Sequence, residues 1–327
     1  MGKTAFITGI NGQDGSYLAE FLIEKGYTVW GILKRNSVAE NQTYRIDSIR
    51  NNPNLHLSYG DLIDLASLVH VLQKCQPDEI YNLAAQSHVR ISFDQPIYTA
   101  QVTGIGTLNL LEAVRLACPK ARIYQASSSE MFGNNIDADG YQRETTALSP
   151  VSPYGCAKVF SHNICCNYRN SYNMFISNGI LFNHESPRRG SNFVTNKVAK
   201  EAAKIKLGLS QKLVLGNMEA TRDWGHAKDY VRAMWMILQH DTPDDFVCAT
   251  GISHSVQYLV DYVFGLLDLD VNQYVETDPR YLRPEELRDL KGDCTKMKTA
   301  LGWKPEYTFE SMMKEMVDYW MDFYTKK

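Results

Sequence analysis

Residues 8 to 15 read TGINGQDG, which places glycines at positions 9, 12 and 15, directly after the strand-like run TAFI and directly before a helix-like stretch. Glycine has no Cβ, so a loop with this spacing turns tightly and lets its backbone approach a pyrophosphate at the N-terminus of the following helix. The order strand, glycine-rich loop, helix is typical of dinucleotide-binding domains. The stretch therefore predicts a cofactor loop that contains Gly9, Gly12, Gln13, Asp14 and Gly15.

The first half of the chain continues with the same alternation. Short runs rich in β-branched and aromatic residues are separated by helix-like stretches with apolar residues at helical spacing. The expected strands cover 4–9, 28–33, 55–60, 79–85 and 121–127, and the expected helices cover 16–26, 62–75 and 103–118. This order predicts an α/β fold, a Rossmann-type doubly wound parallel sheet with helices on both faces, whose ligand lies at the carboxyl ends of the strands.

The pattern loosens after about residue 183. Helices are expected over 194–208 and 226–239, a strand over 245–251, and a last helix from about Phe309. We therefore predict a dinucleotide-binding domain over residues 1–183, with returning segments near 226–252. Residues 184–327 are expected to form mostly a smaller, interleaved C-terminal substrate domain.

Composition excludes several classes of protein. A net charge of −3, with 44% hydrophobic and 22% charged residues, is that of a soluble globular protein and does not indicate a nucleic-acid or membrane-surface binder. No apolar run is long enough to span a bilayer, and the N-terminus shows no signal peptide, so a cytoplasmic location is expected. The seven cysteines have no metal-binding spacing, so we expect reduced thiols and no metal.

The end of the second strand bears on the choice of cofactor. Binders of NAD usually place a carboxylate there for the ribose 2′-hydroxyl. This chain instead has Lys34, Arg35 and Ser37, which suit a 2′-phosphate. NADP is therefore expected. Asp61 and the run LAAQS at residues 83–87 follow later strands, where the adenine and nicotinamide halves would lie.

The stretch SPYGCAK carries a candidate catalytic pair. Tyr154 and Lys158 are four residues apart, so on a helix their side chains share one face. A tyrosine with its ordinary pKa near ~10 is a poor base. We expect the lysine cation to lower the pKa of Tyr154 toward neutrality and also to hold the nicotinamide ribose.

These motifs resemble those of the extended short-chain dehydrogenase/reductase superfamily. Longer stretches, among them YNLAAQSHV, QASSSEMFG, NGILFNHESPRRG, RDWGHAKDYV, RPEEL and LGWKP, make the chain similar to the GDP-mannose 4,6-dehydratase family from about residue 3 to about residue 310. The resemblance implies oxidation of the sugar at C4, removal of the C5 proton, loss of the C6 hydroxyl as water, and return of hydride to C6. It makes Tyr154 the group that takes the O4 proton, Ser128 a hydrogen-bond partner of O4, and Glu130 the C5 base.

The resemblance also implies binding residues and partners. Members of the family form dimers or tetramers, and the turn at Arg35 lies in their tetramer contact. The substrate would be a GDP-sugar, with GDP-mannose expected. With the residues argued above, the expected cofactor set is Gly9, Gly12, Gln13, Asp14, Gly15, Lys34, Arg35, Asn36, Ser37, Asp61, Leu62, Leu83, Ala84, Ala85, Ser87, Tyr98, Tyr154, Lys158, His184 and Arg189. The expected substrate set is Ser87, Ser128, Glu130, Asn183, Lys197, Arg222, Arg283 and Glu286.

Three departures from the family pattern keep alternatives open. Ser128 replaces the usual threonine, Lys34 replaces the first arginine of an Arg-Arg pair, and the segment between Glu130 and Tyr154 is slightly longer than usual. Dehydration of a GDP-manno-heptose would use the same residues. A GDP-sugar epimerase/reductase would leave Glu130 without a task, and a non-catalytic NADP-binding protein would not need serine, glutamate, tyrosine and lysine together.

Overall fold

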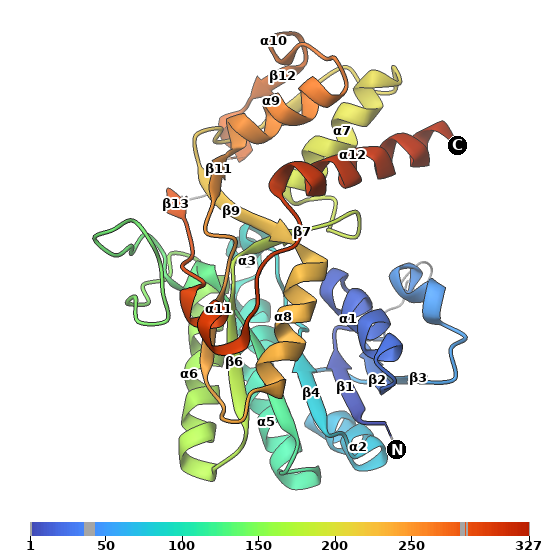
Figure 1. The fold of residues 1–327 in the computed structure, drawn as a ribbon, viewed down its shortest axis with the longest axis vertical. Helices are drawn as coiled ribbons and strands as arrows, with labels where there is room; N and C mark the ends of the chain where they lie inside the picture. Colours follow the sequence, from blue (N-terminus) through green and yellow to red (C-terminus); the bar gives the residue numbers. More distant parts are fainter. Residues whose placement is uncertain (1, 36–42, 282–284, 286, 327) are drawn as a thin grey trace.

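The computed structural model describes residues 2–35, 43–281, 285 and 287–326. Its largest unit is a seven-stranded parallel sheet in the order β10-β6-β5-β4-β1-β2-β3 (Figure 1). The strands are β1 Thr4–Thr8, β2 Thr28–Leu33, β3 Leu55–Tyr59, β4 Glu79–Asn82, β5 Arg122–Ser128, β6 Ile176–Leu181 and β10 Asp245–Cys248. The predicted Rossmann-type fold is confirmed, and β6 is a strand that the sequence pattern did not single out.

Helices cover both faces of this sheet because each has one apolar side. On one face lie α1 and α8, and on the other lie α2, α5 and α6. Their bounds are α1 Gln13–Glu24, α2 Leu65–Cys75, α5 Gly106–Ala117, α6 Pro153–Tyr172 and α8 Ala227–Gln239. Between β4 and α5 the chain forms the short helices α3 Val89–Asp94 and α4 Pro96–Thr99, and then a π-helix over Ala100–Ile105.

A smaller layer stands over the carboxyl ends of the strands (Figure 1). Its apolar core is formed by helices α7, α9 and α12. It comprises β7 Asn183–Glu185, α7 Val194–Lys206, β8 Leu213–Leu215, β9 Thr221–His226, β11 Ser253–Ser255, α9 Val256–Leu266, α10 Val271–Tyr274, β12 Val275–Thr277, β13 Asp289–Leu290 and α12 Phe309–Thr325. Strand β9 pairs with β7, β11 and β13, so it joins segments that are far apart in the sequence.

The chain returns to the large sheet more often than the sequence indicated. Strand β10 pairs with β6, and α11 (Thr295–Leu301) packs against β10. Trp303 is fully buried in the core beneath the sheet and donates from its indole nitrogen to the carbonyl of Asp229, at 3.0 Å. The sequence pattern did not single out α11, because its seven residues are too few for a clear apolar period.

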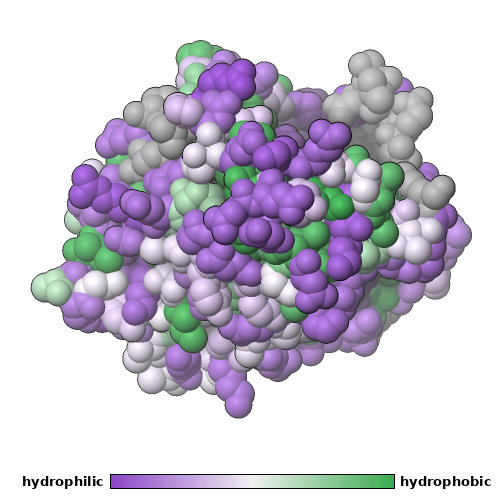
Figure 2. Space-filling view, turned by 90° about the horizontal axis from the view of Figure 1, so that it is seen from above, coloured by the Kyte–Doolittle hydropathy of each residue, from purple (hydrophilic) through white to green (hydrophobic). Residues whose placement is uncertain are grey.

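Seen from the end that carries α12, the surface is mostly hydrophilic, and hydrophobic residues appear in smaller groups between polar ones (Figure 2). Among the described residues, no helix combines the length and the apolar content needed to cross a bilayer.

Candidate active site

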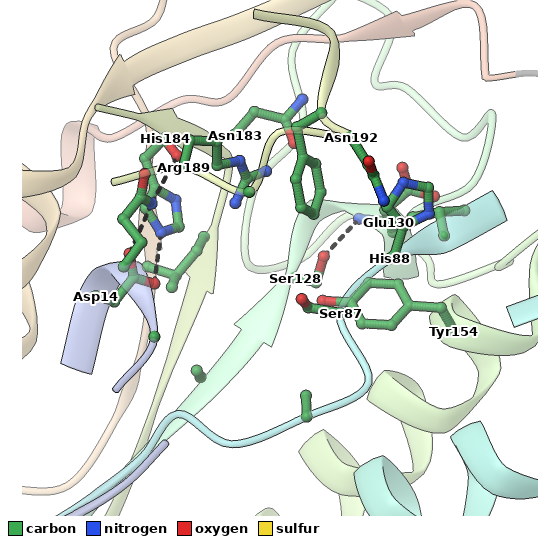
Figure 3. Close-up of a pocket in the computed structure, with 18 of the residues that line it drawn as sticks. Asp14, Ser87, His88, Ser128, Glu130, Tyr154, Asn183, His184, Arg189 and Asn192 are labelled. Carbon is green, nitrogen blue, oxygen red and sulfur yellow. Dashed lines mark hydrogen bonds and ion pairs between the residues drawn. The ribbon is translucent and has the colours of Figure 1, made fainter. Parts of the chain in front are cut away.

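A cavity of about 700 Å³ lies between the carboxyl ends of the sheet strands and the smaller layer. Parallel α/β sheets bind ligands at this edge. Figure 3 shows two groups of polar side chains around it. After the roles predicted for most of them, we call Asp14, His184, Glu185 and Arg189 the cofactor wall, and Ser128, Glu130, Tyr154 and Lys158 the catalytic wall.

The glycine-rich loop forms the floor of the cavity beside the cofactor wall. Gly9 has a φ of +71°, and a Cβ there would lie 3.0 Å from the backbone of Ala84. A Cβ on Gly15 would lie 2.2 Å from the carbonyl oxygen of Gly9. Among the described residues no side chain caps α1, which begins just after Gly12, so its first-turn N–H groups are available at the cavity. Positions 9 and 15 therefore require glycine, and the loop leads into a helix N-terminus that suits a phosphate.

Asp14 and His184 form an ion pair on the cofactor wall (Figure 3). The Nε2 of His184 lies 2.8 Å from a carboxylate oxygen of Asp14, and Nδ1 lies 2.8 Å from the carbonyl oxygen of Phe182. Both partners accept, so both ring nitrogens carry a proton. Burial alone would lower the pKa of His184, but the Asp14 carboxylate outweighs it and raises the pKa. Burial likewise raises the pKa of Asp14, and the His184 cation reverses this to a net lowering.

The rest of the cofactor wall is also paired. The Nε of Arg189 lies 3.0 Å from the buried carboxylate of Glu185, which also accepts from the hydroxyl of Thr195. The guanidinium of Arg189 sits 3.6 Å from the ring centre of Phe193. His184 and Arg189 thus present two positive groups whose positions are fixed before any ligand arrives.

Of the described residues expected beside the adenosine half of the cofactor, some line the cavity and Arg35 does not. Lys34 lines the cavity, pairs with Asp61 at 3.1 Å and donates to the hydroxyl of Tyr98 at 3.0 Å. Arg35 is exposed and is not among the residues that line the cavity. Both residues follow the end of β2, and of the two only Lys34 lines the cavity. Of the other predicted residues, Asn36, Ser37, Arg283 and Glu286 lie outside the described residues.

The catalytic wall comes from two elements. Strand β5 ends at Ser128, whose hydroxyl accepts from the backbone N–H of Glu130 at 3.2 Å and starts a short 3₁₀ turn. Tyr154 and Lys158 lie one turn apart near the start of α6, which Ser152 caps. All four side chains line the cavity, and the exposed fraction of Glu130 is 6%. The turn therefore directs the glutamate into the cavity instead of into solvent.

The pKa values on the catalytic wall differ from the expectation. Burial raises the pKa of Tyr154 to about 12, against the opposing effect of its hydrogen bond with Ser128, and the Glu130 charge adds to the rise. Burial lowers the pKa of Lys158 to about 8, and its Nζ donates to the carbonyl of Ala126 at 2.6 Å. The prediction that Lys158 lowers the pKa of Tyr154 is thus wrong for this structure, because desolvation dominates both groups.

Basic and polar side chains of the smaller layer close the cavity. Asn183 on β7, Lys197 on α7 and Arg222 on β9, which the resemblance implies as substrate-binding residues, all line it. Lys197 donates to the carbonyl of Val214 at 2.6 Å and lies 4.2 Å from the ring centre of Tyr281. The remaining predicted residues on the cavity wall are Gly9, Gly12, Gln13, Gly15, Leu62, Leu83, Ala84, Ala85, Ser87 and Tyr98.

Sequence reasoning missed several residues at this cavity, among them Arg45, His88, Arg188 and Asn192. His88 and Arg188 stand inside motifs already singled out, YNLAAQSHV and NHESPRRG, so their positions were available as a signal. Arg45 follows a segment without periodicity, and nothing in its local sequence pointed to the site.

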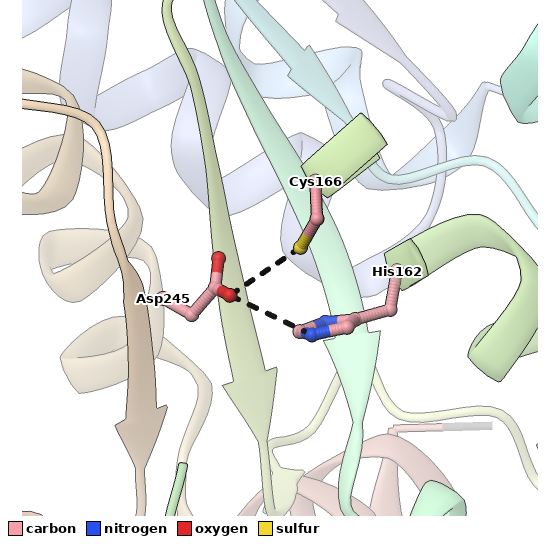
Figure 4. Close-up of side chains that lie close together, drawn as sticks. All are labelled: His162, Cys166 and Asp245. Carbon is pink, nitrogen blue, oxygen red and sulfur yellow. Dashed lines mark hydrogen bonds and ion pairs between the residues drawn. The ribbon is translucent and has the colours of Figure 1, made fainter. Parts of the chain in front are cut away.

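A second cluster lies away from the cavity, where His162, Cys166 and Asp245 come together (Figure 4). Asp245 lies 3.6 Å from Nε2 of His162 and 3.5 Å from the sulfur of Cys166, and it pairs with Arg169. Burial lowers the pKa of His162 and raises that of Cys166 to about 11. The imidazole of His162 and the thiol of Cys166 are therefore neutral, and the Arg169 cation balances the charge of the Asp245 carboxylate. These contacts connect α6 to β10.

A Rossmann sheet whose loop begins a phosphate-binding helix, with tyrosine and lysine one turn apart beside it, defines the extended short-chain dehydrogenase/reductase superfamily. Within it, the family model described as GDP-mannose 4,6 dehydratase matches residues 6–316. The human GDP-mannose 4,6 dehydratase is 50% identical over 97% of this chain and 92% of its own length. The chain belongs to this family, whose members are hydro-lyases.

Solved structures give the same fold at low identity. The dTDP-glucose 4,6-dehydratase of Bacillus anthracis, in complex with NAD, superposes with a TM-score of 0.84 at 23% identity, covering 98% of this chain and 97% of that one. RMD of Pseudomonas aeruginosa, complexed with NADPH, gives a TM-score of 0.81 at 22% identity, with 98% and 99% covered. These likenesses support the fold alone.

Proposed function

We propose that this chain removes water from GDP-mannose and releases GDP-4-keto-6-deoxymannose, with NADP as its cofactor. The observation that carries the proposal is the burial of Glu130 on the same cavity wall as Ser128 and Tyr154. A 4,6-dehydration needs a carboxylate at the fifth carbon while a phenol acts at the oxygen of the fourth. A reductase or an epimerase needs only the phenol.

Ser128 and Tyr154 serve the C4 oxygen in this proposal. Tyr154 accepts the proton from O4, and the hydroxyl of Ser128 holds that oxygen in place. Because burial raises the pKa of Tyr154 to about 12, we infer that Tyr154 takes the O4 proton only as hydride leaves C4, while Lys158 at the next turn of α6 holds the nicotinamide ribose. A nicotinamide held beside these residues would supply the acceptor, and then the donor, of the hydride that moves from C4 to C6.

Glu130 serves the adjacent carbon. Once C4 is a ketone, the C5 proton is acidic, and the carboxylate removes it. The resulting carboxylic acid then protonates the hydroxyl that leaves C6. The proton lost from C5 and the hydroxyl lost from C6 thus leave together as water, and Glu130 returns to its charged form. When hydride reaches C6, C5 takes up one proton, which balances the proton that Tyr154 accepted from O4.

The described residues fit a nicotinamide dinucleotide. The uncapped N-terminus of α1 and the glycines at 9 and 15 form a cradle for the pyrophosphate. Two structural relatives carry NAD and NADPH respectively. For this chain we infer NADP, because Lys34 lies at the end of β2 where NAD binders place a carboxylate. His184 and Arg189 of the cofactor wall would hold the cofactor's charged groups.

For the nucleotide of the substrate, we infer that Lys197 and Arg222 bind the diphosphate and Asn183 the sugar side. Resemblance adds Arg283 and Glu286, the latter as an acceptor for guanine. We further infer that residues 1–183 with 226–252 hold the cofactor and that the rest of 184–327 mostly holds the GDP-sugar.

We also propose that the chain is cytoplasmic and self-associates as a homodimer or homotetramer. Helices α5 and α6 pack together and carry exposed apolar side chains, with exposed fractions of 61% for Leu116, 40% for Phe160 and 51% for Tyr172. A second copy of this face would cover them. Light scattering of the wild type and of Phe160→Glu tests this, and an unchanged mass would exclude the face from the interface.

The activity test is direct. The purified protein is incubated with GDP-mannose and a catalytic amount of NADP, and the alkaline absorbance of a 4-keto sugar is followed. We expect product without net consumption of NADPH, whereas a reductase would consume it and a binding protein would yield nothing. GDP-manno-heptose in a parallel reaction decides which sugar is preferred, and faster turnover of the heptose would overturn the assignment to mannose.

A further inference from the structure

His88 lines the cavity, but the roles assigned above give it no task. Figure 3 shows its ring on the Glu130 side of the cavity, with the Asn192 amide near it and the Asp14–His184 pair on the opposite side. We propose that His88 is a further catalytic residue, which donates a hydrogen bond from Nε2 to the hydroxyl leaving C6. The inference rests on the proposed dehydration of GDP-mannose.

The backbone of His88 is held by one neighbouring side chain. The side-chain oxygen of Gln86 accepts from the N–H of His88 at 2.8 Å, and its amide nitrogen donates to the carbonyl of His88 at 3.1 Å. The same amide nitrogen donates to the hydroxyl of Thr99 at 3.1 Å. The loop after β4 is therefore fixed at the residue that enters the cavity, as a catalytic donor requires.

The ring of His88 is oriented as well. Its Nδ1 accepts the backbone N–H of Ile91 at 3.3 Å and so caps α3. Its ring packs at 49° against Phe193, with 5.1 Å between ring centres. Phe193 in turn lies under the Arg189 guanidinium, so the contact connects His88 to the cofactor wall.

The cap decides which nitrogen carries the proton. Because Nδ1 accepts a hydrogen bond, the neutral imidazole must carry its proton on Nε2. The neutral ring of His88, which lines the cavity, therefore has its donor N–H at Nε2. At the Glu130 side of the cavity, where elimination would take place, such a donor stabilises negative charge as it develops on a leaving oxygen.

The elimination balances with this donor in place. Glu130 removes the C5 proton, electrons move from the C5–H bond to the C5–C6 double bond, and the C6–O bond breaks. The proton held by Glu130 passes to the departing oxygen, which leaves as water. His88 keeps its own proton and only stabilises the charge on that oxygen, so no further acid is required.

Two substitutions separate the donor from the cap. His88→Asn keeps an acceptor where Nδ1 caps α3 but cannot reach the Nε2 position, whereas His88→Gln places an amide donor near Nε2 and loses the cap. Removing one such donor typically slows turnover by about 100-fold or more. We expect that loss in kcat for His88→Asn with an unchanged KM, and partial recovery in His88→Gln. Bound NADP and thermal stability, measured on the same holoenzymes, exclude a folding defect as the cause.

A change of leaving group gives the decisive readout. In GDP-6-deoxy-6-fluoromannose the group lost from C6 is fluoride, which is much less basic than hydroxide and therefore depends less on a hydrogen-bond donor for its departure. If His88 assists departure, the loss in His88→Asn should shrink to roughly 5-fold or less on this analogue. Equal losses on both substrates, or no loss on GDP-mannose, would overturn the inference. No turnover of GDP-mannose by the wild type would instead overturn the proposed function and the inference with it.

Discussion

The two walls of the cavity hold their charges in different ways. On the cofactor wall each charge has a partner at hydrogen-bond distance, and the Asp14–His184 contact is 2.8 Å long. On the catalytic wall Lys158 donates to a neutral carbonyl. Burial lowers the pKa of Lys158 and raises the pKa of Tyr154, so both changes favour the neutral form of the side chain. Paired charges position a ligand, whereas groups shifted by burial are ready to exchange protons once charge arrives. Substitutions on the catalytic wall should therefore affect turnover, and substitutions on the cofactor wall should affect binding or stability.

The largest effect is expected for Glu130→Gln, which keeps the shape of the side chain but removes the base. Loss of a positioned acid–base group typically costs about 10²–10⁴-fold, and this group serves two steps, so we expect the upper end. Bound NADP should remain at the wild-type level because the cofactor wall is untouched. Product formation is measured by the alkaline absorbance of the 4-keto sugar. Turnover near the wild-type rate would place the dehydration chemistry on another residue.

A smaller loss is expected at Ser128, because its hydroxyl orients groups without transferring a proton in the main step. Ser128→Ala removes the hydrogen bond to Tyr154 and the acceptor of the Glu130 N–H, so we expect about a 10–100-fold drop in kcat. Ser128→Thr is the matched control, since it retains the hydroxyl and adds a methyl group that limits its rotamers. We expect it to equal or exceed the wild type. If threonine were as damaging as alanine, the hydroxyl would not be the reason.

Substitutions in the smaller layer should change KM for GDP-mannose. Lys197→Met keeps the aliphatic stem of the side chain but removes the cation that lines the cavity, so we expect KM for GDP-mannose to rise about 10-fold with kcat nearly unchanged. Lys200→Met on the same helix is the control, because Lys200 packs over Trp320 and does not line the cavity. Steady-state kinetics of both variants give the comparison. A fall in kcat for Lys197→Met would show that nucleotide binding and chemistry are not divided between the two regions.

The sequence was most informative where backbone geometry restricts the residue. Gly9 needs a positive φ, and Gly15 leaves no room for a Cβ, so the spacing alone predicted the loop and its place in the sheet. Tyr154 and Lys158 are four positions apart, which is about one helical turn, so their shared face also followed from the sequence. Glu130 needed the resemblance in addition, since a single glutamate after a strand has no distinctive spacing.

Features that depend on tertiary contacts could not be predicted in the same way. Lys34 lines the cavity, whereas Arg35 is exposed. This difference depends on how the end of β2 is oriented, and no local sequence pattern specifies that orientation. The pKa of Tyr154 depends on how completely α6 and the smaller layer exclude water from it. The return of residues 295–303 to the large sheet depends on contacts with β10 and α8, far away in the sequence.

The smallest expected effect concerns the Asp14–His184 pair. The pKa of His184 is raised in the fold, so its contribution to stability is complete below its ordinary pKa of ~6.5 and is lost as the pH rises through the raised value. The pKa of Asp14 is lowered, so its contribution is complete above its ordinary pKa of ~3.9 and is lost only as the pH falls through the lowered value. The pair is therefore fully effective between these ordinary values, from about pH 4 to 6.5. In this window we expect His184→Gln to lower the melting temperature by roughly 1–2 °C, which corresponds to about 1 kcal/mol.

This difference should shrink as the pH rises through the raised pKa of His184, because the wild-type histidine then loses its second proton. His254→Gln is the control, since burial lowers the pKa of His254 and removing that ring should not produce a loss that fades at high pH. Thermal unfolding of the wild type and both variants at pH 6 and pH 9 measures the two differences. A His184→Gln difference that stayed constant with pH would mean that packing against Tyr230, whose ring stacks on His184 at 4.4 Å, supports this wall and that the ion pair does not.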